Sequence, residues 1–367
     1  MNDAFPNLYA IYGSDPFGKV LVKRWQMRPL SMALIAFLLG GCYMGGLAAV
    51  FGYFLPRPGI VASSVDYFNQ VNFFLIFPVI AFYYLAQPAK IEGAYTALIR
   101  HVGKDESWLE EFRIQMNTLS VHRGWWLACF AMGVFVIGTG TYDSILKFGG
   151  WWYSANWLMI AGLQAARGIV VYMILVVFTR HIIASIGFGR IYQRFEILAP
   201  ILPPSQTYGI RAVADYAFTF TILAAVVGLN IGLGPLVADK LGLDYPIQAV
   251  LYLVMAPVGF FLPLWQAHHE MVQSRNRIID NLSAQYQNEY DQLLEDVAHN
   301  AKEADDRFKR LKTIQDTYDL IEKSWTWPFN TSTLYKVIVT ILAPFSLAVL
   351  QVLTGYVSDL VAKLIGR

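Results

Sequence analysis

Long apolar runs separated by charged blocks dominate the chain. A helix needs about 20 mostly apolar residues to cross a hydrocarbon core about 30 Å thick. Seven runs reach roughly that length, and we predict a membrane-spanning helix in each: 30–55, 67–85, 124–142, 156–178, 213–233, 247–264 and 334–356. The pattern therefore predicts an all-α, polytopic membrane protein with about seven transmembrane helices and helical extensions on the cytoplasmic side.

The composition agrees with this fold class. Hydrophobic residues make up 56% of the 367 residues and charged residues only 15%, whereas soluble proteins carry about a quarter charged residues. The net charge of +2 gives no indication of a nucleic-acid partner. Cys42 and Cys129 lie inside apolar runs, so neither a disulfide framework nor a zinc site is indicated.

The positions of Lys and Arg predict the orientation. The segment before the first run and those after the second, fourth and sixth runs hold 21 of these residues, and the opposite connections hold 3. Because cytoplasmic loops carry the excess of Lys and Arg, we expect the N-terminus inside and, after seven spans, the C-terminus outside. The expected location is a plasma membrane or an inner cell membrane.

The longest polar stretch reads as a cytoplasmic hairpin of two amphipathic helices, with apolar residues at three- and four-residue spacing. We expect its first helix to continue the sixth span without a break. Leu293, Val297 and Leu311 lie on the apolar faces, and we predict that they hold subunits together. The predicted organisation is a cytoplasmic segment 1–29, spans one to six within 30–267 with inner loops 89–123 and 180–211, the hairpin 268–325, and a segment 326–367 with the seventh span.

No motif for catalysis is present, so we expect neither an enzyme nor a cofactor. His268 and His269 are the nearest approach to a metal site. Adjacent residues on a helix point about 100° apart, so the two rings do not share a face and no metal is predicted.

Three polar residues inside predicted spans are candidates for a ligand site. Arg167 lies near the membrane midplane, where a charge costs about 2.5–3.5 kcal/mol to insert, and Gln164 is one turn away. Asp215, about one turn into the fifth span, is the carboxylate that we expect to pair with Arg167. The pair is either structural or part of a ligand or ion pathway.

The seventh span carries a second polar pattern. One side of this helix collects Thr340, Pro344, Leu347, Gln351, Thr354 and Ser358. Such a stripe lines a water-filled pore when several copies face one axis, or it forms a helix–helix seam, where small and polar residues also gather. Asp359 would lie at the outer mouth of the pore.

The layout resembles the insect odorant and gustatory receptor superfamily. The shared features are seven spans, an inner N-terminus, an outer C-terminus, inner helical extensions and a polar last span. The resemblance implies four subunits that assemble through the inner region, with the last span of each lining one cation pore. Of the last-span signature of that family, this chain has only Gln351 and Thr354-Gly355-Tyr356. The stretches Phe261-Leu-Pro-Leu-Trp265 and Trp327-Pro-Phe-Asn330 are also similar to multi-pass proteins of prokaryotes.

The leading hypothesis is a homotetrameric ion channel, weakly selective for cations, with ions and a small-molecule ligand as candidate partners. A secondary transporter is the first alternative, because Pro257, Gly259 and Pro263 in the sixth span, with Pro344 in the seventh, could break these helices, although no paired half-repeat is visible. The second alternative is a non-conducting membrane receptor or scaffold whose hairpin recruits a partner.

Overall fold

The computed structural model describes residues 15–102, 123–146, 149–195, 210–237, 244–298, 304–324, 326–327, 329 and 331–346. Over these residues the chain is helical, with turns and two isolated β-bridges but no strand. The predicted all-α class is confirmed.

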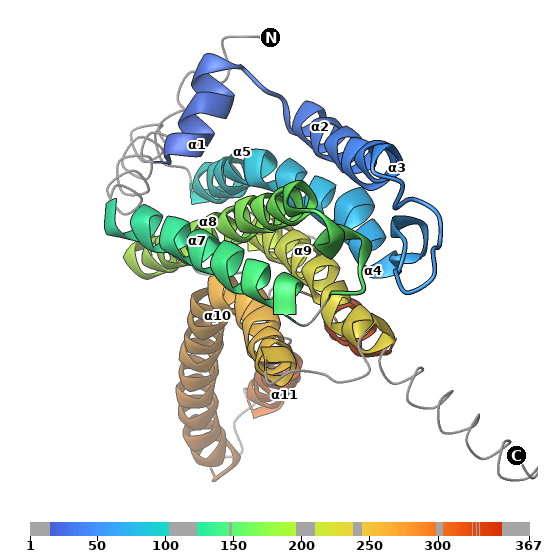
Figure 1. Ribbon diagram of the computed structural model, residues 1–367. Helices are drawn as coiled ribbons and strands as arrows, with labels where there is room; N and C mark the ends of the chain where they lie inside the picture. Colours follow the sequence, from blue (N-terminus) through green and yellow to red (C-terminus); the bar gives the residue numbers. More distant parts are fainter. Residues whose placement is uncertain are drawn as a thin grey trace, which may run out of the picture.

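The described helices are labelled in Figure 1. They are α1 (Pro16–Lys19), α2 (Pro29–Gly41), α3 (Ala48–Val50), α4 (Tyr67–Val71), α5 (Phe77–Val102), α7 (Arg123–Leu146), α8 (Trp157–Phe195), α9 (Ile210–Val237), α10 (Asp244–Ala298) and α11 (Ala304–Glu322). Short π-helical segments at Cys42–Leu47 and Asn72–Ile76 join α2 to α3 and α4 to α5. The last helix among the described residues covers 331–346.

Five helical stretches are long and apolar enough to cross a membrane. They are Pro29–Val50, Tyr67–Leu98, Trp125–Leu146, Trp157–Tyr192 and Ile210–Leu233, which correspond to the first five predicted spans. The chain is therefore a membrane-embedded helical protein. The sixth predicted span lies within α10, and the seventh begins in the last helix and continues outside the described residues.

The spans differ in how far they are buried. In α2 and in α7 only 17% of the apolar window is buried, against 72% in the α4–α5 stretch and 50% in α8. Large apolar side chains are exposed on both α2 and α7, for example Leu38 and Phe130. Lipid tails are as apolar as these side chains, so the exposure is favourable in a membrane. Helices α2 and α7 thus form the lipid-facing rim, and α8 lies inside it against α5, α7 and α10.

Helix α10 extends far beyond the bundle. It has 55 residues, which corresponds to about 80 Å at 1.5 Å per residue, more than a membrane thickness. Its second half and α11 project away from the other helices as a hairpin (Figure 1). The predicted helical continuity between the sixth apolar run and the hairpin is confirmed.

Candidate functional site

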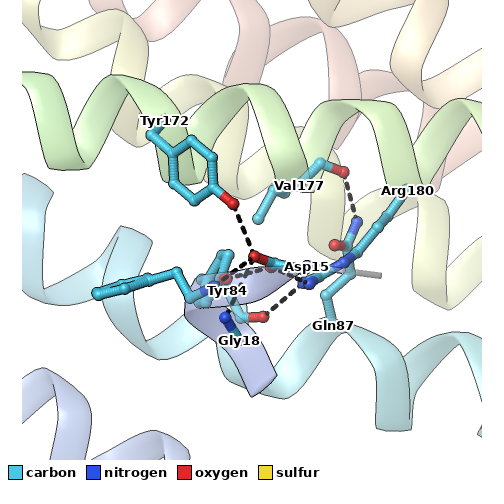
Figure 2. Close-up of polar contacts among 8 residues, drawn as sticks. Asp15, Gly18, Tyr84, Gln87, Tyr172, Val177 and Arg180 are labelled. Atoms are coloured by element: carbon cyan, nitrogen blue, oxygen red, sulfur yellow. Dashed lines mark hydrogen bonds and ion pairs between the residues drawn. The ribbon is translucent and has the colours of Figure 1, made fainter. Parts of the chain in front are cut away.

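A buried ion pair joins the start of the described chain to α8. The Arg180 guanidinium lies 2.8 Å from the Asp15 carboxylate, and the two side chains are 1% and 0% exposed. Tyr172 donates a hydrogen bond of 2.7 Å to the other carboxylate oxygen, and the Tyr84 hydroxyl also donates to Asp15 (Figure 2). A buried charge is tolerated only when its partners replace the lost water, and here each carboxylate oxygen has them.

Asp15 also begins α1. Its carboxylate accepts hydrogen bonds from the backbone N–H groups of Phe17 and Gly18, at 3.1 and 3.2 Å. These N–H groups have no partner inside a helix, so a side-chain acceptor at this position stabilises the helix start. One carboxylate therefore both starts α1 and fastens it between α5 and α8.

Arg180 has a second role, set by a proline in α5. Pro88 lies inside this helix and has no N–H, so it cannot bond to the carbonyl four residues earlier, that of Tyr84. Arg180 Nη1 donates a hydrogen bond of 3.0 Å to that same carbonyl oxygen. The arginine therefore satisfies a backbone group that the proline leaves without its helical donor.

The next residue along α8 does the same for α10. Pro263 lies inside α10, so the Gly259 carbonyl lacks its helical donor. His181 Nε2 lies 2.6 Å from that oxygen. A carbonyl oxygen only accepts, so Nε2 carries the hydrogen, and Nδ1 of the neutral ring accepts from the Tyr216 hydroxyl 2.9 Å away. The ring stacks on Phe220 at 3.6 Å between centroids.

Two adjacent residues of α8 thus donate hydrogen bonds to the two backbone carbonyls, one in α5 and one in α10, that a proline leaves without a helical donor. Arg180 and His181 point to different sides of α8, because successive helical residues diverge by about 100°. Arg180 reaches α5 and α1, and His181 reaches α9 and α10. We call this group (Asp15, Tyr84, Tyr172, Arg180, His181, Tyr216 and Gly259) the proline-gap joint. Its two groups of hydrogen bonds meet at these adjacent residues of α8 and connect this helix to α1 and α5 on one side and to α9 and α10 on another.

Sequence reasoning missed this joint. It placed Arg180 and His181 in an inner loop, because a charged residue and a histidine end the apolar run. The available signal was the pair of in-helix prolines, Pro88 and Pro263, each of which requires a donor from elsewhere.

Arg167 belongs to a second polar cluster, nearer the beginning of α8. Its guanidinium donates a hydrogen bond of 3.2 Å to Asn69. The Asn69 amide donates to Asp66 at 2.7 Å, and the Trp152 indole N–H donates to the same carboxylate oxygen at 2.8 Å. Burial raises the pKa of nearby Tyr153 above its ordinary value. The predicted neighbour Gln164 is buried and donates instead to the Ser144 hydroxyl, at 3.0 Å.

The predicted pairing of Arg167 with Asp215 is wrong. Asp215 is exposed, and its neighbour Tyr216 meets His181. Arg167 precedes His181 by fourteen residues, or about 21 Å along a helix. The charges of Arg167 and Asp215 therefore lie at different levels of the bundle. The apolar pattern located both residues in spans but could not give the relative register of the helices.

The three residues that we predicted to hold subunits together differ in their exposure within the hairpin. Leu311 is buried, at 5% exposure, while Leu293 is half-buried and Val297 is 57% exposed. Arg307 of α11 bridges to α10 through Asp296 and Glu289, and the hydrogen bond to Asp296 raises its pKa. Leu311 therefore packs within the hairpin of its own chain, which corrects its predicted role between subunits.

Only two of the predicted pore residues lie in the described part of the last helix. Thr340 is half-buried, whereas Pro344 is buried, and a Cβ atom added to Gly228 of α9 would lie 3.0 Å from the Pro344 ring. Pro344 thus packs against a helix of its own chain, which argues against its predicted pore-lining role. Leu347, Gln351, Thr354, Ser358 and Asp359 lie outside the described residues.

Among the residues that the structure describes, no group of three or more His, Cys, Asp or Glu side chains could hold a metal ion.

No protein-family model, curated protein or solved structure matches this chain.

Proposed function

We propose that this chain is a subunit of an oligomeric membrane channel, weakly selective for cations, that assembles through the α10–α11 hairpin. The observation that carries the proposal is an apolar stripe on the part of α10 that extends beyond the bundle. Tyr286, Tyr290, Leu294 and Val297 lie on one side of this helix and are 36%, 41%, 53% and 57% exposed. A contiguous apolar surface of this kind marks a protein interface.

The stripe is distinct from the surface that α11 covers. Arg307 of α11 reaches Glu289, Gln292 and Asp296, which lie on a different side of α10 from Tyr290 and Val297 at about 100° per residue. A second copy of the same hairpin is therefore a fitting partner for the stripe. Because α10 is one continuous helix from Asp244 to Ala298, contact between hairpins would also hold the bundles of neighbouring subunits in register.

The same helix supports a gating role. The proline-gap joint fastens α10 at Gly259 to α8, and α11 precedes the last helix. A change at the joint would thus reach both the assembly surface and the last helix. In a channel with the layout of the insect odorant and gustatory receptors, that helix would line the pore with Gln351, Thr354 and Ser358. Neutral amide and hydroxyl groups of this kind coordinate partly dehydrated cations without strong selectivity.

A non-conducting receptor or scaffold is the second candidate, and the position of Pro344 favours it. The predicted stripe of the last helix packs at this residue inside the chain, which is the geometry of a helix seam. The transporter alternative has less support, because α10 continues through Pro257 and Pro263 without the interruption that such a binding site requires.

Two measurements test the proposal. The mass of the purified complex should correspond to four subunits, and liposomes that contain it should pass small monovalent cations. A thiol reagent should reduce the flux through the Gln351→Cys variant, and the Val349→Cys variant is the matched control on the opposite side of the helix. A monomer, or a folded oligomer without flux, would exclude the channel, and the latter result would favour the scaffold.

A further inference from the structure

A groove of about 710 Å³ lies between α1, α7 and α8. It is lined by Pro16, Phe17 and Val20 near α1, by Trp126, Leu127, Phe130, Gly133, Val134 and Ile137 of α7, and by Gly168, Ile169 and Tyr172 of α8. It lies beside the proline-gap joint, because Tyr172 belongs to both.

The walls of the groove select hydrocarbon. None of the described residues that line it is charged, and the hydroxyl of Tyr172 already donates to Asp15. Apolar cavities of this kind stay free of water. An occupant with hydrogen-bonding groups would lose its hydration here without gaining partners.

The groove opens toward the lipid. Leu127, Phe130, Val134 and Ile169 are 67%, 62%, 51% and 48% exposed, and α7 is one of the two least buried spans. Between them, Gly133 and Gly168 bring the two backbones together: a Cβ atom on Gly133 would lie 3.0 Å from the Gly168 carbonyl oxygen. An acyl chain of a surrounding lipid can therefore enter the groove from the side.

The length of the groove fits one leaflet. Its α7 lining runs from Trp126 to Ile137, which is eleven steps along the helix or about 17 Å at 1.5 Å per residue. Half of a hydrocarbon core about 30 Å thick is about 15 Å. Trp125 and Trp126 stand at one end, and tryptophan is enriched at the membrane–water interface. The groove thus runs from the headgroup level to the middle of the membrane.

We propose that this groove binds one acyl chain of a membrane phospholipid. The inference rests on the membrane-embedded fold and is independent of the channel proposal. The bound chain would contact Phe17, whose ring meets that of Tyr172 edge-on at 6.3 Å and 86°. It would thereby complete the surface on which α1 rests, beside the Asp15–Arg180 ion pair.

Photolabelling tests the proposal. The full-length protein is placed in nanodiscs with a phosphatidylcholine that carries a diazirine in the middle of one acyl chain, and the labelled peptides are mapped. We expect labelling to concentrate at Phe130, Val134 and Ile169, severalfold above the exposed Leu34 and Leu38 of α2. Val134→Trp fills the groove from its rim and should reduce labelling of Ile169 severalfold. Met132→Trp, on an exposed position outside the groove, should leave it unchanged.

Three results would overturn the assignment. One is labelling of α2 as strong as that of the groove. Another is Ile169 labelling that persists in a folded Val134→Trp variant. The third identifies a different occupant: a diazirine fatty acid that labels the groove when the phospholipid does not, or a cysteine at Phe130 that cross-links two copies of the chain in a variant lacking Cys42 and Cys129.

Discussion

The geometry of the proline-gap joint predicts that the contributions of His181 and Pro263 to stability are coupled. If the imidazole supplies the hydrogen bond that Pro263 withholds from Gly259, the cost of losing His181 must depend on that proline. In His181→Leu the buried Gly259 carbonyl has no donor, and a buried polar group without a partner costs about 1–3 kcal/mol. The Tyr216 hydroxyl loses its acceptor in the same variant, but that loss does not depend on residue 263 and therefore cancels in a double-mutant cycle with Pro263.

Restoring the backbone donor should offset this loss. In Pro263→Ala, residue 263 regains an N–H that points at the Gly259 carbonyl in a continuous helix. The loss of stacking on Phe220 is the same with either residue at position 263 and cancels in a double-mutant cycle. We therefore expect His181→Leu to cost about 1–2 kcal/mol less in the Pro263→Ala background than in the original chain.

The assay is the free energy of unfolding in mixed micelles for the four members of the cycle. Pro257→Ala is the matched control, because it lies in the same helix but restores the bond to Leu253, which His181 does not contact. Strict additivity of His181→Leu and Pro263→Ala would refute the reasoning. Equal rescue by Pro257→Ala would also refute it, because the effect would then come from a general stiffening of α10.

Two further predictions concern the corrected residues. Val297→Glu, at an exposed position, should lower the mass of the complex and leave each subunit folded. Leu311→Glu, at a buried position, should instead open the hairpin and expose it to limited proteolysis. Dissociation of the complex by both variants with the hairpin intact would contradict these two roles. Unfolding of Arg167→Leu variants should show a coupling of about 0.5–3 kcal/mol with Asn69→Leu and none with Asp215→Leu; coupling to Asp215 alone would exclude the described contact.

The sequence predicts what depends on the order of residues along one helix. The lengths of the apolar runs located the first five spans, and the amphipathic spacing predicted the hairpin and its continuity with the preceding helix. These features follow from a repeat within one segment. The partner of Arg167 and the burial of Leu311 and Pro344 depend on how two segments meet, and no single-segment pattern contains that register.

The proline-gap joint lies between these two cases. Pro88 and Pro263 each remove one backbone donor, and burial requires that each freed carbonyl find another. The sequence therefore predicts that two donors exist without showing where they are. Only a long donor side chain can reach across to a neighbouring helix, and α8 offers Arg180 and His181 in adjacent positions that face different helices.

This arrangement explains why an arginine and a histidine are buried at the end of an apolar run instead of ending the helix there. Each satisfies a carbonyl that no leucine could satisfy, and Arg180 in addition balances the Asp15 charge that holds α1. The hydrogen bond from His181 is also reversible in a way that a backbone hydrogen bond within a helix is not, since a rotation of one side chain releases it. A displacement of α8 would therefore be transmitted to α10, and through this continuous helix to the hairpin, by the contact between His181 and Gly259.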